Sequence, residues 1–357
     1  MNNFTRRQAL TIGAVTLAST FGDLRGVAMA SERASPAIDP ISLVDPELRP
    51  GLERMIKSVG EFKVGPGNLA DLRKAWEMVA PAQTPPYEVK RIAGPTGAPE
   101  VRIIVINGQS GAASRPAIVY LHGGGYIGGV ADSKIPSMQR VALEHECVVV
   151  CVDYRLAPET RFPGALEDNY AALKWVYESA EVLGVDRSRI AVMGESAGGG
   201  HAASLAIAAR DRGEVPIAGQ ILIYPMLDDR TGSSRRVPPF IGTFIWVPAS
   251  NRYGWTSLLG VPAGSRIVPA GAVPARAQDL SGLPATFIGV GSLDLFVEED
   301  IAYAGRLISS GVPTELLVIP GAFHGFDGLA PESGAAIRFR LAWNTALNGV
   351  LAAKNAT

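Results

Sequence analysis

Short apolar runs alternate with longer amphipathic stretches from Tyr87 to the end of the chain. The runs have the length and composition of buried strands and lie at residues 101–106, 117–121, 147–152, 190–193, 220–224, 286–290 and 315–319. Helical spacing is found between them, near residues 133–145, 165–182, 197–210, 299–309 and 334–351. This alternation is typical of an α/β protein whose mostly parallel sheet is covered by helices on both faces.

Two segments depart from this alternation. Residues 47–59 and 69–79 have helical spacing without strand patterns. A gap of about sixty residues separates the runs at 220–224 and 286–290, and a structureless loop of that length is uncommon, so we expect a helical insertion there. Its aromatic residues fit the lining of a binding pocket and the core of the insertion equally well; they include Phe240, Phe244, Trp246, Tyr253 and Trp255.

The first thirty residues have the pattern of an export signal. Arg6-Arg7 precede a modest apolar stretch, and Ala28-Met29-Ala30 offers the small residues of a cleavage site before Ser31. The segment resembles a twin-arginine signal, so we expect residues 1–30 to direct export to the periplasm or the medium. The alternative is a frayed N-terminus on a cytoplasmic protein. The apolar stretch is too short to span a membrane.

Composition and charge narrow the class of protein. The chain has 357 residues, of which 47% are hydrophobic and 19% charged, so it can bury a large core. Its formal net charge is −1 and it has no basic stripe, which argues against a nucleic-acid partner. Cys147 and Cys151 would lie about 13 Å apart along a strand, too far for a disulfide, so we expect both to pack in the core.

The clearest catalytic pattern is Gly194-Glu195-Ser196-Ala197-Gly198. It follows the apolar run at 190–193 and precedes a helical span, which is the strand, sharp turn and helix that a nucleophile elbow requires. The glycines relieve crowding around a strained turn. Ser196 is therefore the candidate nucleophile.

A second pattern, His122-Gly123-Gly124-Gly125, directly follows the run at 117–121. Three glycines let backbone N–H groups approach a substrate oxyanion, as in the glycine loops of acyl-transfer enzymes. A plain turn or a phosphate-binding loop is the alternative, but no dinucleotide-binding fingerprint accompanies the glycines. We therefore expect this loop to supply oxyanion donors, with a further donor from Ala197.

A serine hydroxyl needs a base, and the chain has four histidines. His122 belongs to the glycine loop and is expected to fix its shape by hydrogen bonding. His145 is expected on a helix surface or interface, and His201 on the helix after Ser196, pointing away from the hydroxyl. His324 alone lies in a loop after the last strand, where a general base is needed.

The acid that orients the base should lie between Ser196 and His324 in sequence. Asp294 follows the run at 286–290, and Asp228-Asp229 follow the run at 220–224, so both sites are strand-end loops. We favour Asp294. The acids Glu298, Glu299 and Asp300 are expected in the first turn of the next helix, where they suit the helix dipole.

Taken together, several motifs resemble those of the hormone-sensitive-lipase-like (bacterial family IV) esterases. They are the glycine loop, the segment Asp153-Tyr154-Arg155-Leu156-Ala157-Pro158-Glu159, the elbow with Gly199, the stretch Asp279-Leu280-Ser281-Gly282-Leu283-Pro284 and the ending His324-Gly325-Phe326. The resemblance implies an α/β-hydrolase fold with an eight-stranded sheet in a catalytic domain at 86–357. It also implies a helical cap made of residues 31–85 and an insertion around 230–265.

The same resemblance assigns roles to residues. It implies a triad of Ser196, Asp294 and His324 and oxyanion donors at Gly124, Gly125 and Ala197, with His122, Gly123 and Glu195 in support. The family usually has Asp where this chain has Glu195. Its members act mostly on short- to medium-chain carboxylic esters without a cofactor, and many form dimers.

Two other functions remain open at this level. The same triad could hydrolyse amides or aryl-formamides. A non-catalytic ligand-binding relative would be expected to lack the serine or the histidine, and both are present. No metal-ligand spacing occurs, so we expect neither a metal nor an organic cofactor.

Overall fold

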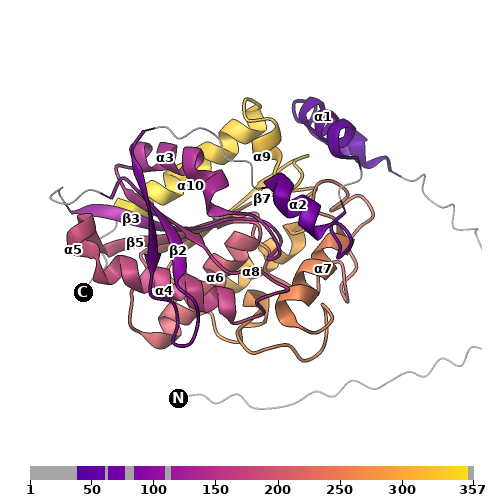
Figure 1. The fold of residues 1–357 in the computed structure, drawn as a ribbon. Helices are drawn as coiled ribbons and strands as arrows, with labels where there is room; N and C mark the ends of the chain where they lie inside the picture. The colour runs from indigo at the N-terminus through magenta and orange to yellow at the C-terminus, as the bar shows by residue number, and fades with distance from the viewer. Residues whose placement is uncertain (1–37, 61–62, 77–83, 109–113, 353–357) are drawn as a thin grey trace, which may run out of the picture. The chain divides into compact units, whose positions relative to one another are not determined.

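The computed structural model describes residues 38–60, 63–76, 84–108 and 114–352 (Figure 1). The predicted export signal at residues 1–30 lies outside the described residues. Within the described ranges, no helix is long and apolar enough to cross a membrane.

One eight-stranded sheet forms the centre of the described chain, with strand order β1-β2-β4-β3-β5-β6-β7-β8. β2 is antiparallel to both of its neighbours, and the strands from β4 to β8 pair in parallel. This confirms the predicted mostly parallel sheet. The strands are β1 (Tyr87–Ile92), β2 (Val101–Ile106), β3 (Arg115–Leu121), β4 (Val148–Asp153), β5 (Val185–Glu195), β6 (Gly219–Ile223), β7 (Ala285–Gly291) and β8 (Thr314–Ile319).

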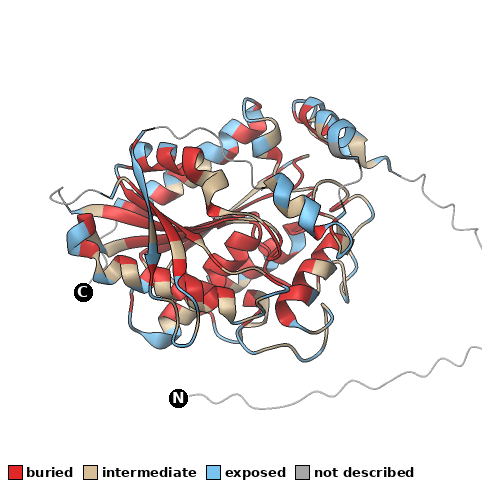
Figure 2. Cartoon of the chain, in the orientation of Figure 1, coloured by how far each residue is buried: buried red, intermediate tan, exposed pale blue. Residues whose placement is uncertain are grey.

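Helices cover both faces of the sheet (Figure 1), and burial is concentrated in the strands between them (Figure 2). Because side chains alternate along a strand, Val119 and Leu121 of β3 join one apolar cluster while Ile118 and Tyr120 join the other. The first cluster includes side chains of α4 (Gly164–Glu178), α5 (Ala180–Leu183), α6 (Ala197–Arg212) and α8 (Val297–Ser309); the second includes α1 (Arg49–Val59), α3 (Ile135–Glu144), α9 (Phe326–Leu329) and α10 (Gly334–Ala352).

The insertion between β6 and β7 is less helical than predicted. Its one α-helix among the described residues is α7 (Pro248–Leu259), and a short 3-10 turn follows at Pro274–Arg276. Turns and bends fill the rest, because Pro238, Pro239 and Gly242 interrupt any helix before α7. The N-terminal segment contributes α1 and α2 (Leu69–Trp76); the last residues of the predicted helix at 69–79 lie outside the described ranges.

Two buried aspartates anchor the insertion where it leaves β6. Asp229 accepts hydrogen bonds from Arg276 at 2.7 Å and 2.8 Å and from the Gly264 N–H at 2.9 Å. Asp228 forms ion pairs with Arg230 and Arg235. Both carboxylates therefore bind arginines of the insertion itself.

His145 was predicted on a helix surface or interface, and the structure places it at the interface between α3 and α10. The side chain is buried, and its two ring nitrogens lie 2.7 Å and 2.8 Å from the side-chain oxygens of Asn348 and Asn344 on α10. His145 thus links the end of α3 to α10. Cys147 and Cys151 are free and buried in the core, as predicted, and burial raises the pKa of the Cys147 thiol to about 12.

Candidate active site

Ser196 lies in a sharp turn between β5 and α6. Its φ of 55° is a left-handed conformation, which is uncommon for a residue with a side chain. Three backbone hydrogen bonds hold it: its N–H donates to Ile223 at 2.9 Å, and its carbonyl accepts from Gly200 at 3.0 Å and Met226 at 2.9 Å. The strained turn therefore presents the hydroxyl at the carboxyl edge of the sheet, where loops after the neighbouring strands converge.

Gly198 lets the start of α6 approach the end of β3. A Cβ atom on this glycine would overlap the carbonyl oxygens of Leu121 and His122. No other residue type fits such an approach without displacing the backbone. This contact places Ser196 directly beside the glycine loop, which we define as residues 122–129.

The structure brings Ser196, Asp294 and His324 together. The Ser196 hydroxyl lies 2.9 Å from His324 Nε2, and His324 Nδ1 lies 2.8 Å from Asp294 Oδ2. If Nδ1–H donates to the carboxylate, Nε2 is left to accept the serine proton. Asp294 is fully buried, and Ser196 and His324 are each only 7% exposed. The geometry is that of a nucleophile, a base and an acid that orients the base.

Neighbouring groups fix the acid and the base in place. Asp294 Oδ1 accepts a hydrogen bond from the Phe296 N–H at 3.0 Å. The His324 ring meets the rings of Tyr224 and Phe296 edge-on, with centroids 4.8 Å and 5.2 Å away. We had not singled out Tyr224 or Phe296 from the sequence. The available signal was that Tyr224 ends the predicted strand at 220–224 and that Phe296 lies two residues after the candidate acid Asp294.

The competing acids have other partners. Asp228 and Asp229 bind arginines of the insertion, so neither carboxylate is the one that meets His324. Glu298, Glu299 and Asp300 begin α8 as predicted, but the last two are buried. Glu299 accepts the N–H groups of Leu227 and Asp228 at 2.6 Å and 3.1 Å, and burial raises its pKa well above the ordinary value.

The glycine loop forms a tight turn over the nucleophile. The Gly124 carbonyl accepts the N–H groups of Ile127 at 3.1 Å and Gly128 at 3.0 Å, and Gly124 and Gly125 have φ values of 131° and 61°. Among the described residues, no hydrogen bond uses the N–H groups of Gly124, Gly125 or Ala197. These three donors therefore remain available to a ligand beside the serine.

His122 shapes the loop, as expected from the sequence. Its Nδ1–H donates to the Gly123 carbonyl at 2.8 Å, and its ring stacks on Tyr154 with centroids 4.3 Å apart. The Tyr154 hydroxyl donates to the His122 carbonyl at 2.5 Å. Burial lowers the pKa of His122, which favours the neutral ring.

Glu195, next to the nucleophile, forms an ion pair with Lys134 in the 3-10 turn Ala131–Lys134 before α3. Burial opposes ionisation of Glu195, but the Lys134 ammonium, with smaller contributions from Tyr120 and His122, lowers the pKa of the carboxyl. The pair joins the elbow to the segment that follows the glycine loop.

The aromatic residues of the insertion divide between the site and the core. Trp246 is buried against Gly125, and its indole N–H donates to Asn251 at 3.1 Å. The Phe244 ring meets Phe323, the neighbour of His324, with centroids 6.1 Å apart. Trp255 is fully buried against Tyr126 and fills the core of the insertion.

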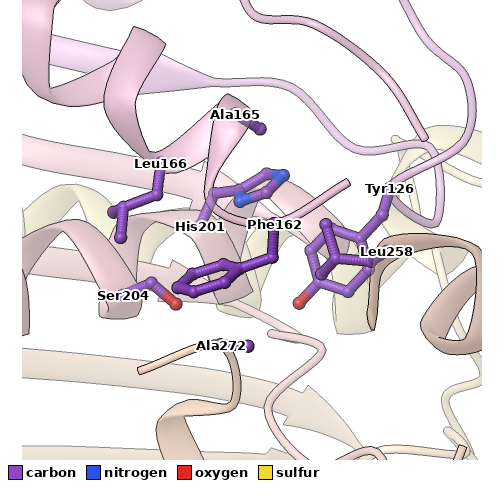
Figure 3. A pocket seen from close by; sticks show the side chains of 8 residues that line it. All are labelled: Tyr126, Phe162, Ala165, Leu166, His201, Ser204, Leu258 and Ala272. Carbon is purple, nitrogen blue, oxygen red and sulfur yellow. The ribbon is translucent and has the colours of Figure 1, made fainter. Parts of the chain in front are cut away.

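His201 lies behind the glycine loop, where its ring meets Tyr126 and Tyr154 edge-on with centroids 4.7 Å and 4.6 Å away. Burial, with a smaller contribution from His122, lowers its pKa to about 3, so the ring is neutral. It borders a small internal pocket of about 10 Å³ (Figure 3) that is lined by Tyr126, Phe162, Ala165, Leu166, His201, Ser204, Leu258 and Ala272. His201 therefore supports the loop by packing.

Comparison with known proteins agrees with this geometry. A sequence model of the alpha/beta hydrolase fold matches residues 118–328. Esterase LipI of Mycobacterium tuberculosis is 37% identical over 243 residues, which cover 67% of this chain and 74% of that protein. The ethyl acetate hydrolase of Pseudomonas putida is 36% identical over 224 residues, which cover 59% and 65% of the two chains.

Solved structures give the same result. A bacterial heroin esterase superposes with a TM-score of 0.79 at 36% identity and covers 88% of this chain and 100% of its own. Esterase LipW from Mycobacterium marinum superposes with a TM-score of 0.75 at 32% identity and covers 88% and 98% of the two chains.

Proposed function

This chain belongs to the hormone-sensitive-lipase-like (family IV) carboxylesterases of the α/β-hydrolase superfamily, and we propose that it hydrolyses short- to medium-chain carboxylic esters through an acyl-enzyme on Ser196. The observation that carries the proposal is the continuous hydrogen-bonded path from the Ser196 hydroxyl through His324 to Asp294.

In the acylation step, Ser196 Oγ attacks the ester carbonyl as His324 Nε2 takes its proton. The buried Asp294 carboxylate accepts from Nδ1–H and stabilises the imidazolium that forms. We assign the N–H groups of Gly124, Gly125 and Ala197, which no other hydrogen bond uses among the described residues, to the oxyanion that the carbonyl oxygen becomes. His324 then gives its proton to the leaving alcohol.

Deacylation repeats the sequence with water in place of serine. His324 removes a proton from water, the hydroxide attacks the acyl carbonyl, and the proton returns to Ser196 as the carboxylic acid leaves. Since Ser196 and His324 are nearly buried, the developing charges are stabilised by fixed dipoles with little bulk water nearby.

An apolar groove supports the choice of substrate size. It has a volume of about 510 Å³, lies between α1 and the insertion, and is lined in part by Leu52, Met55, Ile56, Phe244 and Ile245. One of its lining residues, Phe244, contacts Phe323, which precedes His324 in the chain. Such a groove suits the apolar part of a modest ester.

The assignment of Ser196 is tested by S196A with S204A as its control. Ser204 lies on α6 and is also 7% exposed, so the two variants remove equally buried hydroxyls. We expect S196A to lose p-nitrophenyl acetate turnover and fluorophosphonate labelling, and S204A to keep both. A near wild-type rate in S196A would refute the mechanism.

The substrate class is tested with a series of p-nitrophenyl esters from acetate to palmitate and with anilides of the same acids. We expect kcat/KM to be greatest among the short and medium esters. Preference for the anilides would instead assign an amidase.

We also infer export and self-association, both from the sequence. The twin-arginine pattern at Arg6-Arg7 and the cleavage pattern at Ala28-Met29-Ala30 support a mature chain that begins at Ser31. The family resemblance supports a homodimer. N-terminal sequencing and light scattering of protein purified from its native host test the two inferences.

A further inference from the structure

Arg73 on α2 connects the N-terminal segment to the glycine loop. Its Nε–H donates to the Ile127 carbonyl at 2.7 Å, and one terminal nitrogen donates to the Ala157 carbonyl at 2.9 Å. Both terminal nitrogens also donate to the Glu159 carboxylate at 2.8 Å. The guanidinium therefore joins the glycine loop to the loop that follows β4.

The bonded carbonyl belongs to the turn that orients the free N–H groups. Ile127 and Gly128 both donate their N–H groups to the Gly124 carbonyl, which closes the turn. Trp76, also on α2, lies so close to Gly128 that a Cβ atom there would overlap its ring. Two side chains of α2 thus contact both residues that close the turn around Gly124.

The geometry of Arg73 matters more than its charge. The Arg73 side chain is 25% exposed and Glu159 is 62% exposed, and ion pairs this open to solvent add little stability. The contacts with Ile127 and Ala157 are partly buried, and a planar guanidinium can serve both carbonyls and the carboxylate at once. Lysine has one ammonium group and cannot reproduce this fork.

The insertion also contacts the loop, at Gly125. Trp246 lies against Gly125, and a Cβ atom on Gly254 of α7 would overlap the Gly125 carbonyl. α2 and the insertion therefore both contact the loop. Loss of either contact leaves the turn room to shift.

We propose that Arg73 is a positioning residue of the esterase, which holds the N–H groups of Gly124 and Gly125 at the oxyanion by fixing the Ile127 carbonyl. The proposal rests on the proposed function, because it assumes that these N–H groups bind the oxyanion. Arg73 acts through the loop and does not touch the substrate. Its removal should slow the chemical step more than it weakens substrate binding.

The expected loss of kcat follows from the short distance over which a hydrogen bond acts. Oxyanion donors act at about 2.7–3.1 Å, and removal of one donor lowers kcat by about 100-fold or more. A displaced loop weakens two donors without removing either. We therefore expect R73M to lower kcat by about 30-fold with KM changed by less than about 3-fold, and R73K to lie between R73M and the wild type.

Two variants separate this role from charge and from general stability. E159Q removes the ion pair but keeps the bonds of Arg73 to Ile127 and Ala157, so its kcat should stay within about 2-fold of the wild type. Arg210 offers a matched control: its side chain is 22% exposed and donates to the carbonyls of Asp279 and Ser281, away from the site. R210M should keep kcat although it loses the same kind of bond.

A thionoester substrate provides a readout that stability alone does not move. Sulfur is a weak hydrogen-bond acceptor, so the ratio of ester to thionoester turnover reports how well the N–H donors are placed. We expect this ratio to fall in R73M by about the same factor as kcat, while it stays at the wild-type value in R210M and E159Q.

The outcomes distinguish a failure of the role proposed for Arg73 from a failure of the proposed esterase function. Unchanged kcat in R73M, or a loss of kcat with an unchanged ester-to-thionoester ratio, would overturn the role of Arg73. Because the ratio does not depend on the fraction of folded enzyme, partial unfolding of R73M does not obscure it. If S196A also remained active, the proposed function itself would have failed.

Discussion

Two structural constraints at position 125, one on the backbone and one on the space for a side chain, can be met only by glycine. The φ of Gly125, at 61°, is left-handed, and the Trp246 indole occupies the space that a Cβ atom would need. The first constraint concerns the backbone of residue 125 and the second concerns its neighbour. A substitution at this position must therefore move either the loop or the tryptophan.

We expect G125A to lower kcat by about 100-fold, as if one oxyanion donor had been lost. G271A is the control: Gly271 is also left-handed, with φ 79°, but a Cβ atom there would meet only Phe162 at 3.7 Å. It should add about 1–2 kcal/mol of backbone strain and leave kcat unchanged. Steady-state kinetics and urea unfolding measure both effects; equal kcat values for the two variants would contradict the argument.

At the residue scale, the sequence predicts which side chains are catalytic better than it predicts which residues they contact. Ser196 and His324 follow from a motif and a strand-end position, and the structure brings them within hydrogen-bond distance. From the sequence, Asp294 and Asp228 are both candidates for the acid that orients His324, because both follow predicted strands. Only the fold shows that Asp228 meets Arg230 and Arg235, since these pairings depend on how the insertion turns back.

At the scale of elements, regular burial made the strands predictable. The central strands are apolar throughout because helices cover both faces. β1 is an exposed edge strand with polar residues, so it lacked this pattern. The insertion was predicted as helical, but outside α7 it consists mostly of turns and bends, and the arginines that bind Asp228 and Asp229 leave no periodic pattern in the sequence.

The anchor of the insertion can be tested at Arg276. Asp229 is fully buried and loses its main counter-charge in R276M, so we expect the free energy of unfolding to fall by about 3 kcal/mol, the lower end of the range for broken buried pairs, because Arg276 is 20% exposed. The double variant D229N/R276M should recover part of this loss. Urea unfolding of the wild type, R276M, D229N and the double variant gives the coupling energy, and additive losses would contradict an anchoring role.

For the whole molecule, His201 links stability to pH. Its pKa is about 3 in the fold against an ordinary value of 6.5, so the unfolded chain takes up a proton first as the pH falls. Protonation then favours unfolding, and stability is lost as the pH drops below about 6.5 toward 3. Above pH 6.5 both states are neutral at this residue and the effect disappears.

H201F should weaken this acid sensitivity. Between pH 6.5 and 4.5, the wild type should lose about 2.5 kcal/mol more than the variant, at about 1.4 kcal/mol for each pH unit. Other buried acids such as Glu299 and Asp300 titrate in both proteins, so the difference isolates His201. Urea unfolding at the two pH values measures it; parallel losses would exclude His201 as the cause.

Trp76 and Arg73 of α2 and Trp246 of the insertion all contact the glycine loop, and the insertion also lines the apolar groove described above. Substitutions in the insertion that enlarge the groove for a bulkier ester are therefore expected to loosen the support of the oxyanion donors as well. We therefore expect a substitution in the insertion that changes the substrate range to change kcat as well. Variants selected in the laboratory for bulkier esters should first show a lower kcat. Later substitutions that restore contact with the glycine loop should then raise kcat again.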